Sequence, residues 1–206
     1  MKNTIKSTMN NNIKGNMRVI SLLSLVLFAI MLNACTTLVD ATTKAPIQPD
    51  PSKRTLGTYI DDKRLQLIIG VNLRKADPAL KQSHINVTSF NGVVLLSGQV
   101  PTQAMRLLAA QTASEVHSVR QVHNELQIKG NIAMLARTND AWLATKVKSV
   151  LLANQDIQSR KVKAVVDDGV VYLMGLATQA QANKIANVVS NIGGIKEVVR
   201  VFEYID

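Results

Sequence analysis

Few residues in this sequence have the types and spacing that catalysis or metal binding requires. Asp167 and Asp168 adjoin, as a catalytic pair of carboxylates can, but Gly169 follows them, and an Asp-Gly pair is typical of a tight turn without any catalytic role. The three histidines have no Cys or carboxylate at a metal-ligand spacing: His84, His117 and His123. We therefore expect no metal, no cofactor and no enzymatic activity.

The single cysteine, Cys35, indicates covalent lipid attachment. Four basic residues precede the apolar run VISLLSLVLFAIML, whose 14 residues are fewer than the about 20 that span a bilayer: Lys2, Lys6, Lys14 and Arg18. The run ends in Leu32-Asn33-Ala34-Cys35, which resembles the lipobox of bacterial lipoproteins. The resemblance implies that residues 1–34 are a signal peptide and that Cys35 is acylated. Thr36 follows where an Asp tends to retain lipoproteins in the inner membrane, which implies transfer to the outer membrane.

Two alternatives stay open at this end of the chain. One is a plain signal peptide with an incidental cysteine, and the other is an anchor that is not cleaved. Translation can also start at Met17 instead of Met1, because MRVISLL is already a complete signal opening.

Removal of the signal makes the chain less basic. Lys and Arg fall from 24 to 20 against 14 Asp and Glu, so the net charge falls from +10 to +6, which suits an anionic surface. Aromatic residues make up only 3% of the chain, which argues against a base-stacking nucleic-acid surface. Residues 35–58 contain three prolines and no sustained apolar period, so we expect an acylated N-terminus followed by a flexible tether.

The rest of the chain repeats itself. INVTSFNGVVLLSGQV at 85–100 returns as VKAVVDDGVVYLMGLA at 162–177, and VHSVRQV at 116–122 returns as IGGIKEV at 192–198. Each copy predicts a helix, two strands joined by an Asn-Gly or Asp-Gly turn, an alanine-rich helix and a last strand. We therefore expect an α+β fold of two tandem domains, each α-β-β-α-β with two helices packed on a three-stranded mixed sheet.

The repeat also predicts boundaries and packing. We expect domain 1 at 59–129, a linker at 130–139 and domain 2 at 140–206, with first helices at about 61–76 and 140–153. The second helices should bury two stripes: Ala104, Leu107, Leu108 and Ala113, then Ala182, Ile185, Ala186 and Val189. The second strands, VVLL and VVYLM, are apolar at every position, so both faces of each sheet should be covered. The neighbouring repeat is the expected cover, and a different protein is the alternative.

The helix NDAWLATKVKSVLL carries apolar residues on two faces. Its core face is formed by Leu143, Val147, Val150 and Leu151, whereas Trp142, the only tryptophan, falls with lysines on the outer face. A tryptophan ring suits a bilayer interface, and lysine stems reach phosphate groups from there. From the wheel alone, burial of Trp142 against the first repeat or the linker remains an equal alternative.

The repeated motifs, with trailing VRQVHNEL and GGIKEVV, resemble BON domains. The resemblance covers essentially all of the mature chain and implies a dual-BON outer-membrane lipoprotein that faces the periplasm, supports envelope integrity and associates with the division site. It implies that the second domain binds anionic phospholipid, such as phosphatidylglycerol, through its first helix. The outer face of that helix supplies the expected lipid-binding residues: Trp142, Thr145, Lys146, Lys148, Ser149, Leu152 and Ala153. The alternative is a scaffold that docks an envelope protein partner through the same helix.

Overall fold

The computed structural model describes residues 55–130 and 134–205. The expected signal peptide, the acylated Cys35 and the tether up to Arg54 lie outside the described residues. The two repeats fall in one compact unit of the chain.

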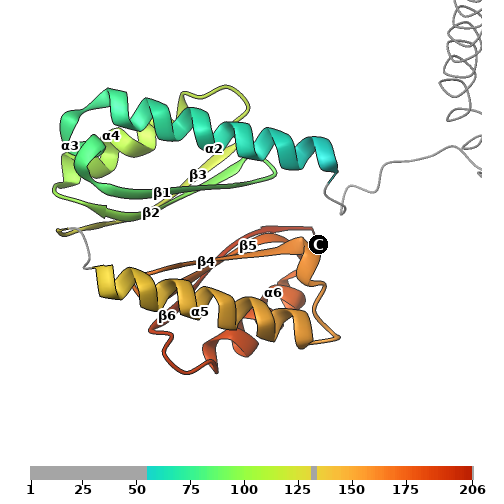
Figure 1. Cartoon of the computed structure of the whole chain (residues 1–206). Coiled ribbons are helices and arrows are strands. Elements are labelled where there is room, and N and C mark those ends of the chain that lie inside the picture. The colour runs from blue at the N-terminus through green and yellow to red at the C-terminus, as the bar shows by residue number, and fades with distance from the viewer. Residues whose placement is uncertain (1–54, 131–133, 206) are drawn as a thin grey trace, which may run out of the picture. The chain divides into compact units, whose positions relative to one another are not determined.

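The first repeat forms two layers, with helices on one face of a three-stranded sheet (Figure 1). Strand β1 pairs antiparallel with β2, and β2 pairs parallel with β3, which confirms the expected mixed sheet. The short helix between the first helix and the first strand was not expected. The elements in chain order are α2 (Leu56–Ala76), α3 (Pro78–Gln82), β1 (His84–Phe90), β2 (Val93–Val100), α4 (Gln103–Ser114) and β3 (Gln121–Ile128).

The second repeat has the same topology, with β4 antiparallel and β6 parallel to the central strand β5. A short 3-10 helix takes the place of the additional α-helix of the first repeat. The elements are α5 (Met134–Ala153), η1 (Ser159–Lys161), β4 (Val162–Asp167), β5 (Val170–Ala177), α6 (Gln179–Ser190) and β6 (Glu197–Tyr204).

Both first helices begin earlier than the apolar pattern predicts. Helix α2 begins at Leu56, in the last part of the expected tether, because the Thr55 hydroxyl accepts a hydrogen bond from the Thr58 amide and caps the helix. Helix α5 begins at Met134, inside the segment expected to be a linker. The buried stripe of α5 starts only at Asp140, so the first turns of this helix leave no trace in the apolar period.

The hairpin turns have the conformation that their sequences predict. Asn91 and Gly92 have φ of 53° and 76°, and Asp168 and Gly169 have φ of 50° and 76°, so both pairs form two-residue turns with positive φ. The turn before the last strand also keeps its shape in both repeats, because Ser118 adopts a φ of 74° where the second repeat has a glycine.

A buried carboxylate ties each first helix to the hairpin of its own sheet. Asp62 accepts hydrogen bonds from the backbone amides of Asn91 and Gly92 at 2.9 and 3.0 Å. At the equivalent position Asp140 accepts two bonds of 2.8 Å from the amides of Asp168 and Gly169. Each carboxylate thus satisfies amide groups that the tight turn leaves without strand partners.

The helices of each repeat bury their apolar stripes against one face of its sheet. In α6 the buried residues are those expected, with Ala182, Ile185 and Val189 in the core and Ala186 packed against it. The expected stripe of α4 was wrong in part: Ala104 is exposed and Leu107 is 60% exposed, whereas Met105 and Ala109 contact the core. Helix α4 has Ala or Leu on nearly every side, so its apolar period does not define one face.

Each sheet has helices on one face, and the faces without helices pack on each other (Figure 1). This second core joins side chains of β1 and β2 to side chains of the second sheet: Phe90, Val93, Leu95, Val170, Tyr172, Met174, Leu176 and Val201. The neighbouring repeat is therefore the cover that the doubly apolar strands predicted.

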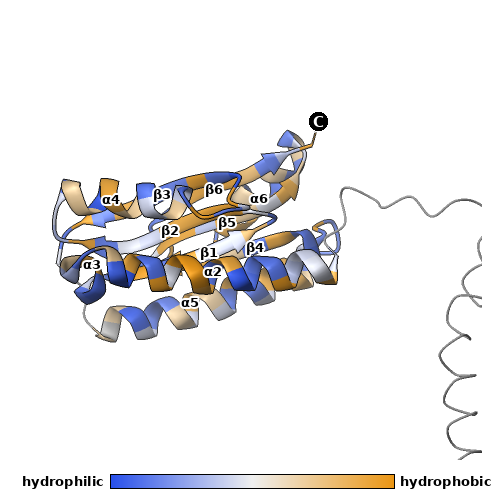
Figure 2. Cartoon of the chain, turned by 90° about the horizontal axis from the view of Figure 1, so that it is seen from above, coloured by the Kyte–Doolittle hydropathy of each residue, from blue (hydrophilic) through white to orange (hydrophobic). Residues whose placement is uncertain are grey.

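The helices are distributed unequally around the paired sheets. Seen from above, α2 and α5 lie on one side, next to β1 and β4, whereas α4 and α6 lie on the other side (Figure 2). In the direction in which the sheets stack, however, α2 covers the outer face of the first sheet and α5 covers the outer face of the second, so the two sheets separate these helices (Figure 1).

Candidate functional site

The rotation of α5 about its axis is fixed by its buried side. Leu143, Val147 and Leu151 are at most 4% exposed and pack into the core of the second repeat. Asp140, the only acidic residue of the helix, is on the same side and is held by the hairpin turn. The opposite face of α5 therefore carries no carboxylate.

Large apolar side chains project from that opposite face. The side chains of Trp142 and Leu152 are 57% and 62% exposed, and Met134 in the first turn is 80% exposed. At about 1.5 Å of rise per residue, Trp142 and Leu152 lie roughly 15 Å apart along the helix. The tryptophan is therefore not packed inside the unit, which was the alternative that the helical wheel left open.

Lys146 is held against the indole ring. Its Nζ lies 4.9 Å from the centroid of the Trp142 ring and donates a hydrogen bond of 3.2 Å to the carbonyl oxygen of Gly193, in the turn before β6. An ammonium group has three N–H donors, so two remain for an external anion. The same contact limits how the Trp142 side chain can rotate.

Lys148 lies on the other flank of the apolar stripe. Two residues along a helix correspond to about 200° of rotation, so Lys146 and Lys148 stand on opposite sides of Trp142 and Leu152. Lys148 is exposed, and neither lysine forms a salt bridge within the described parts of the chain.

The remaining expected residues lie between these positions. Thr145, Ser149 and Ala153 are exposed on the same helix. The Thr145 hydroxyl donates to the Ala141 carbonyl oxygen at 3.0 Å, so it already has a partner within the helix. The structure thus places all seven expected residues on the outer arc of α5, and lipid binding by them stays a prediction.

Two relevant residues were missed from the sequence. Met134 lies 18 residues, or five turns, before Leu152 and so extends the same stripe, but the helix was expected to start after it. Asp140 was not recognised as the residue that orients the helix. The sequence does contain a sign of this role, because an aspartate occurs at the same position of both repeats, Asp62 and Asp140, 78 residues apart. Each lies on the apolar side of its helix, and an Asn-Gly or Asp-Gly turn follows it in the chain.

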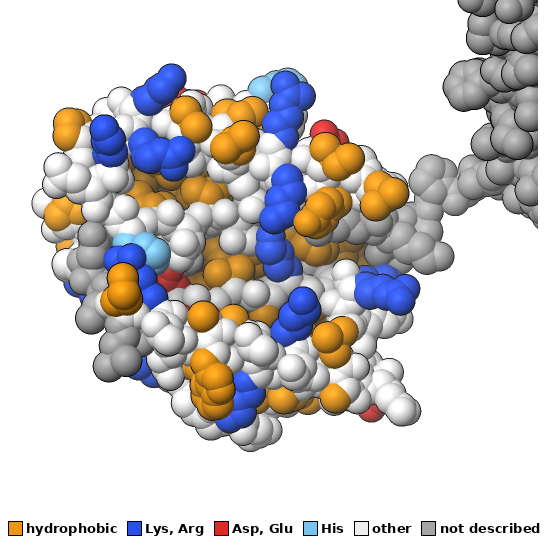
Figure 3. Space-filling model, in the orientation of Figure 1, with side chains coloured by type: hydrophobic (Ala, Val, Ile, Leu, Met, Phe, Trp, Pro, Cys, Tyr) orange, Lys and Arg blue, Asp and Glu red, His pale blue; other side chains and the backbone are white. Residues whose placement is uncertain are grey.

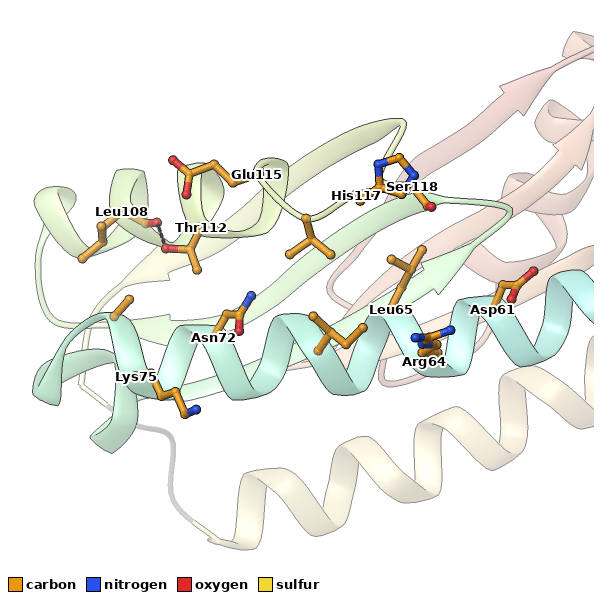
Figure 4. A pocket seen from close by; sticks show the side chains of 13 residues that line it. Asp61, Arg64, Leu65, Asn72, Lys75, Leu108, Thr112, Glu115, His117 and Ser118 are labelled. Carbon is orange, nitrogen blue, oxygen red and sulfur yellow. Dashed lines mark hydrogen bonds between the residues drawn. The ribbon is translucent and has the colours of Figure 1, made fainter.

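A cavity of the described residues lies elsewhere, between α2 and α4 of the first repeat (Figure 4). It has a volume of about 960 Å³, and its lining combines apolar side chains, Leu65 and Leu108 among them, with charged side chains of both signs. The Thr112 hydroxyl in its wall donates to the Leu108 carbonyl oxygen at 2.8 Å. The acidic and basic groups do not converge on one point, as an acid–base or phosphate site would require.

Two further findings concern chemistry and membranes. Within 55–130 and 134–205, no three His, Cys, Asp or Glu side chains are placed to hold a metal ion. In the same residues, no helix combines the length and apolarity needed to cross a bilayer.

The fold and the outward helix define the class: a tandem repeat protein of two α-β-β-α-β modules joined sheet to sheet. The chain belongs to the BON domain family, because the family's model matches residues 61–130 and 139–206. These two ranges are the two repeats.

Known members are similar over most of their length. The chain is 36% identical to Outer membrane lipoprotein DolP of Haemophilus influenzae, across 86% of this chain and 92% of that protein. It is 34% identical to a 21 kDa hemolysin of Actinobacillus pleuropneumoniae, across 78% and 80%, and 31% identical to Osmotically-inducible protein Y of Escherichia coli, across 72% and 75%. This similarity and the lipobox-like sequence at Cys35 identify the chain as an outer-membrane lipoprotein.

Proposed function

We propose that the second BON domain binds anionic phospholipid through the outer face of α5, on the periplasmic side of the outer membrane. The observation that carries this proposal is the combination on one helix face of exposed Trp142 and Leu152 with flanking Lys146 and Lys148, without a carboxylate. In the bound state Trp142 and Leu152 insert among the acyl chains near the headgroups, and the two ammonium groups contact phosphate oxygens.

The energies involved make the contact weak by itself. Each lysine contributes about 1 kcal/mol near an anionic surface, and full burial of a leucine side chain contributes roughly 1.5–3 kcal/mol. Partial insertion therefore gives an affinity in roughly the millimolar range for the free chain. Acylation of Cys35 holds the folded part close to lipid, so a weak patch is sufficient in the anchored protein.

The cellular role follows from this contact and from the family. We infer that the bound protein supports envelope integrity, at the division site. Increased detergent sensitivity of cells that carry Trp142→Glu, with loss of a labelled protein from the septum, is the expected result. An unchanged septal signal in that variant would show that α5 does not direct the protein there.

Trp142 itself provides the direct test, because it is the only tryptophan of the chain. The mature chain without its acyl group should show a blue shift of tryptophan emission with phosphatidylglycerol vesicles and none with phosphatidylcholine vesicles. Exchange of both flanking lysines, Lys146→Gln with Lys148→Gln, should weaken this binding by about thirtyfold. The matched control, Lys184→Gln with Arg200→Gln, removes the same charge from α6 and β6 and should bind as the wild type does.

The scaffold alternative predicts a different result in the same assay. A helix that docks a protein needs no lipid, so the absence of a blue shift with either kind of vesicle would contradict lipid binding. An equal blue shift with both kinds would contradict the dependence on an anionic headgroup. Changes in amide NMR chemical shifts that are confined to residues 140–153 in phosphatidylglycerol micelles would support lipid binding by α5.

A further inference from the structure

Helix α2 of the first repeat has an outward face with large apolar side chains. Six residues follow one another along this face at steps of four and three, the spacing with which one helix packs along another: Leu56, Ile60, Lys63, Leu67, Gly70 and Arg74. Leu56, Ile60 and Leu67 are 84%, 64% and 66% exposed. These six residues form the outer stripe of α2, which runs along the helix opposite the buried Leu65 and Ile69.

The second repeat does not share this stripe. The equivalent positions of α5 lie 78 residues further along the chain: Met134, Thr138, Ala141, Thr145, Lys148 and Leu152. The middle of that row carries threonine and alanine where α2 has larger side chains. Conversely, Arg64 and Ile68 of α2 stand where α5 has Trp142 and Lys146. The outer stripe of α2 is therefore not a copy of the proposed lipid-binding face.

Helix α2 lies on the opposite side of the stacked sheets from α5. The two helices cover the outer faces of different sheets (Figure 1). Packed sheets are about 10 Å apart and a helix with its side chains is about 10–12 Å across, so the outer sides of α2 and α5 are roughly 30 Å apart. An interfacial helix enters a leaflet by only about 5–10 Å. With α5 on the membrane, the outer stripe of α2 thus faces the periplasm, beyond the reach of lipid. This exclusion of lipid rests on the proposed function of α5.

The charge around the outer stripe indicates the kind of partner. Four basic residues of α2 are exposed and form no salt bridge within the described parts of the chain: Lys63, Arg64, Arg74 and Lys75. Of the two acidic residues of α2, Asp62 is buried in the hairpin contact, which leaves Asp61 alone exposed. Over α2, Figure 3 shows Lys and Arg next to hydrophobic side chains, with few Asp or Glu. A partner with acidic side chains complements this face.

The geometry of the outer stripe favours a helix of another protein. Outside the backbone of α2, only Nη1 of Arg74, at 3.6 Å, lies within 4 Å of a Cβ added at Gly70, so a second backbone can approach closely there. A second copy of the chain is a poorer partner. With two stripes in full overlap, Lys63 would face Lys63 or Leu67 of the other copy, without an acidic partner.

We infer that the outer stripe of α2 docks an acidic amphipathic helix of a periplasmic protein. Leu56, Ile60 and Leu67 pack into the apolar side of that helix, and the four basic residues pair with its carboxylates. The second domain then holds the protein on the bilayer while the first domain holds a partner on the periplasmic side. This gives the first repeat a role that its fold does not otherwise explain.

A synthetic helix tests this docking directly. The probe is a labelled peptide of about 21 residues, with leucine at the a and d positions of three heptads and glutamate at e and g, where the like charges oppose self-pairing. The unacylated mature chain should raise its fluorescence anisotropy, and should not do so for the same peptide with lysine in place of glutamate. Leu67→Gln should weaken the binding by about tenfold or more. Gly70→Gln should weaken it too, because the new side chain blocks the close approach although it favours the helix.

Two control proteins locate the peptide. Leu107→Gln is the matched control, since Leu107 is 60% exposed on α4, and it should bind as the wild type does. The protein with Lys146→Gln and Lys148→Gln should do the same, whereas a loss of binding there would place the peptide on α5 and overturn the inference. Equal binding of the acidic and basic peptides, no binding of the acidic one, or unchanged binding by Leu67→Gln also overturns it.

Cells separate this inference from the proposed function of α5. The protein with Leu67→Gln and Gly70→Gln should bind phosphatidylglycerol vesicles as the wild type does, but its cells should become sensitive to detergent. Wild-type resistance of these cells overturns the docking role of α2 and leaves lipid binding by α5 standing. Weaker vesicle binding by this variant would place α2 in the lipid contact, which overturns the inference as well. Absence of vesicle binding by the wild type overturns the proposed function alone, because the peptide assay contains no lipid.

Discussion

The carboxylate of Asp167, in the second repeat, accepts a hydrogen bond of 2.7 Å from the side-chain amide of Gln99, in the first repeat. Both residues are buried, and Asn86 donates a further bond of 2.8 Å to the same carboxylate. A buried charge is stable only with such partners. The polar contact therefore adds specificity to the apolar packing between the sheets, because it forms only when the two repeats are aligned in this register.

Asp167→Ala should destabilise the pair of repeats. The exchange removes the acceptor of the buried Gln99 amide and of the half-buried Asn86 amide, at about 1–3 kcal/mol for each group. We expect the free energy of unfolding in urea to fall by about 2–4 kcal/mol, with the same helix content in the folded state. Asp156→Ala is the control, since Asp156 is exposed and its loss should change stability little. Equal stability of the Asp167→Ala protein and the wild type would show that the polar contact is dispensable.

Asp62 and Asp140 should each be required for stability. Either carboxylate accepts two backbone amide bonds at a hairpin, and hydrogen bonds to a charged acceptor contribute about 1.5–3 kcal/mol each. Asp140→Ala should lower the free energy of unfolding by about 3–6 kcal/mol and increase hydrogen exchange at the amides of Asp168 and Gly169. If exchange at these amides stayed slow, another group would have to protect them.

These contacts show where sequence reasoning succeeds and where it stops. The repeat predicted the topology, and the Asn-Gly and Asp-Gly pairs predicted the turns, because both depend on local conformation. The outer arc of α5 was predictable because Leu143, Val147 and Leu151 define one core side. In α4 the apolar residues surround the helix, so Leu107 was placed in the core although it is exposed.

Contacts between distant residues were not predictable. The partners of Asp167 are Asn86, Ser97 and Gln99, and the equivalent positions of the second repeat are Lys163, Met174 and Leu176. The interface is therefore not repeated, and no periodicity marks it. The hydrogen bond from Lys146 to Gly193 likewise joins two residues 47 positions apart, so the sequence does not indicate it. The contact of Lys146 with Trp142 joins residues four positions apart in one helix, and a helical wheel can predict such a contact.

The contact between the repeats should weaken in acid. Hydrogen bonding by Lys129 holds the pKa of Asp168 below its ordinary value, and Arg120 does the same for Glu203. Lys129 and Arg120 belong to the first repeat, so both ion pairs cross the interface. A carboxyl whose pKa is lowered by folding stabilises the fold above its unfolded pKa, about 4, and this contribution is lost as the pH falls through the folded pKa.

His123 adds a second step at higher pH. Burial lowers its pKa, although Glu125 acts in the opposite direction, so the unfolded chain binds the proton more tightly. Stability should therefore begin to decline as the pH falls below about 6.5 and decline further below about 4. Urea unfolding at a series of pH values measures this. His123→Gln should remove the decline of stability below about pH 6.5, and Asp168→Asn with Glu203→Gln should reduce the decline below about pH 4. A decline that persists in its variant would have to come from other groups.

Gly175 should not tolerate a side chain. A Cβ at this position would lie 2.1 Å from the carbonyl oxygen of Lys161, and the φ of 150° is one that L-residues rarely adopt. We expect Gly175→Ala to lower the melting temperature strongly or to prevent folding. Gly130→Ala is the control, because nothing lies within 4 Å of a Cβ there. If the Gly175→Ala protein had the same melting temperature as the wild type, β5 would have to be able to move away from the start of β4.

Binding of α5 to anionic vesicles should depend on salt through its two flanking lysines. Charges at a membrane surface are screened within about 10 Å at 0.1 M salt and about 3 Å at 1 M, whereas insertion of Trp142 and Leu152 is not weakened by salt. The affinity of the unacylated chain for phosphatidylglycerol vesicles should therefore fall as salt rises and level off at a residual apolar contribution. The Lys146→Gln, Lys148→Gln protein should start near that residual level and respond less to salt. Trp142→Glu should retain little binding at any salt concentration, because it replaces the inserted ring by a charge that the leaflet repels. Parallel salt curves for the wild type and the lysine variant would show that the positive charge acts from elsewhere on the protein.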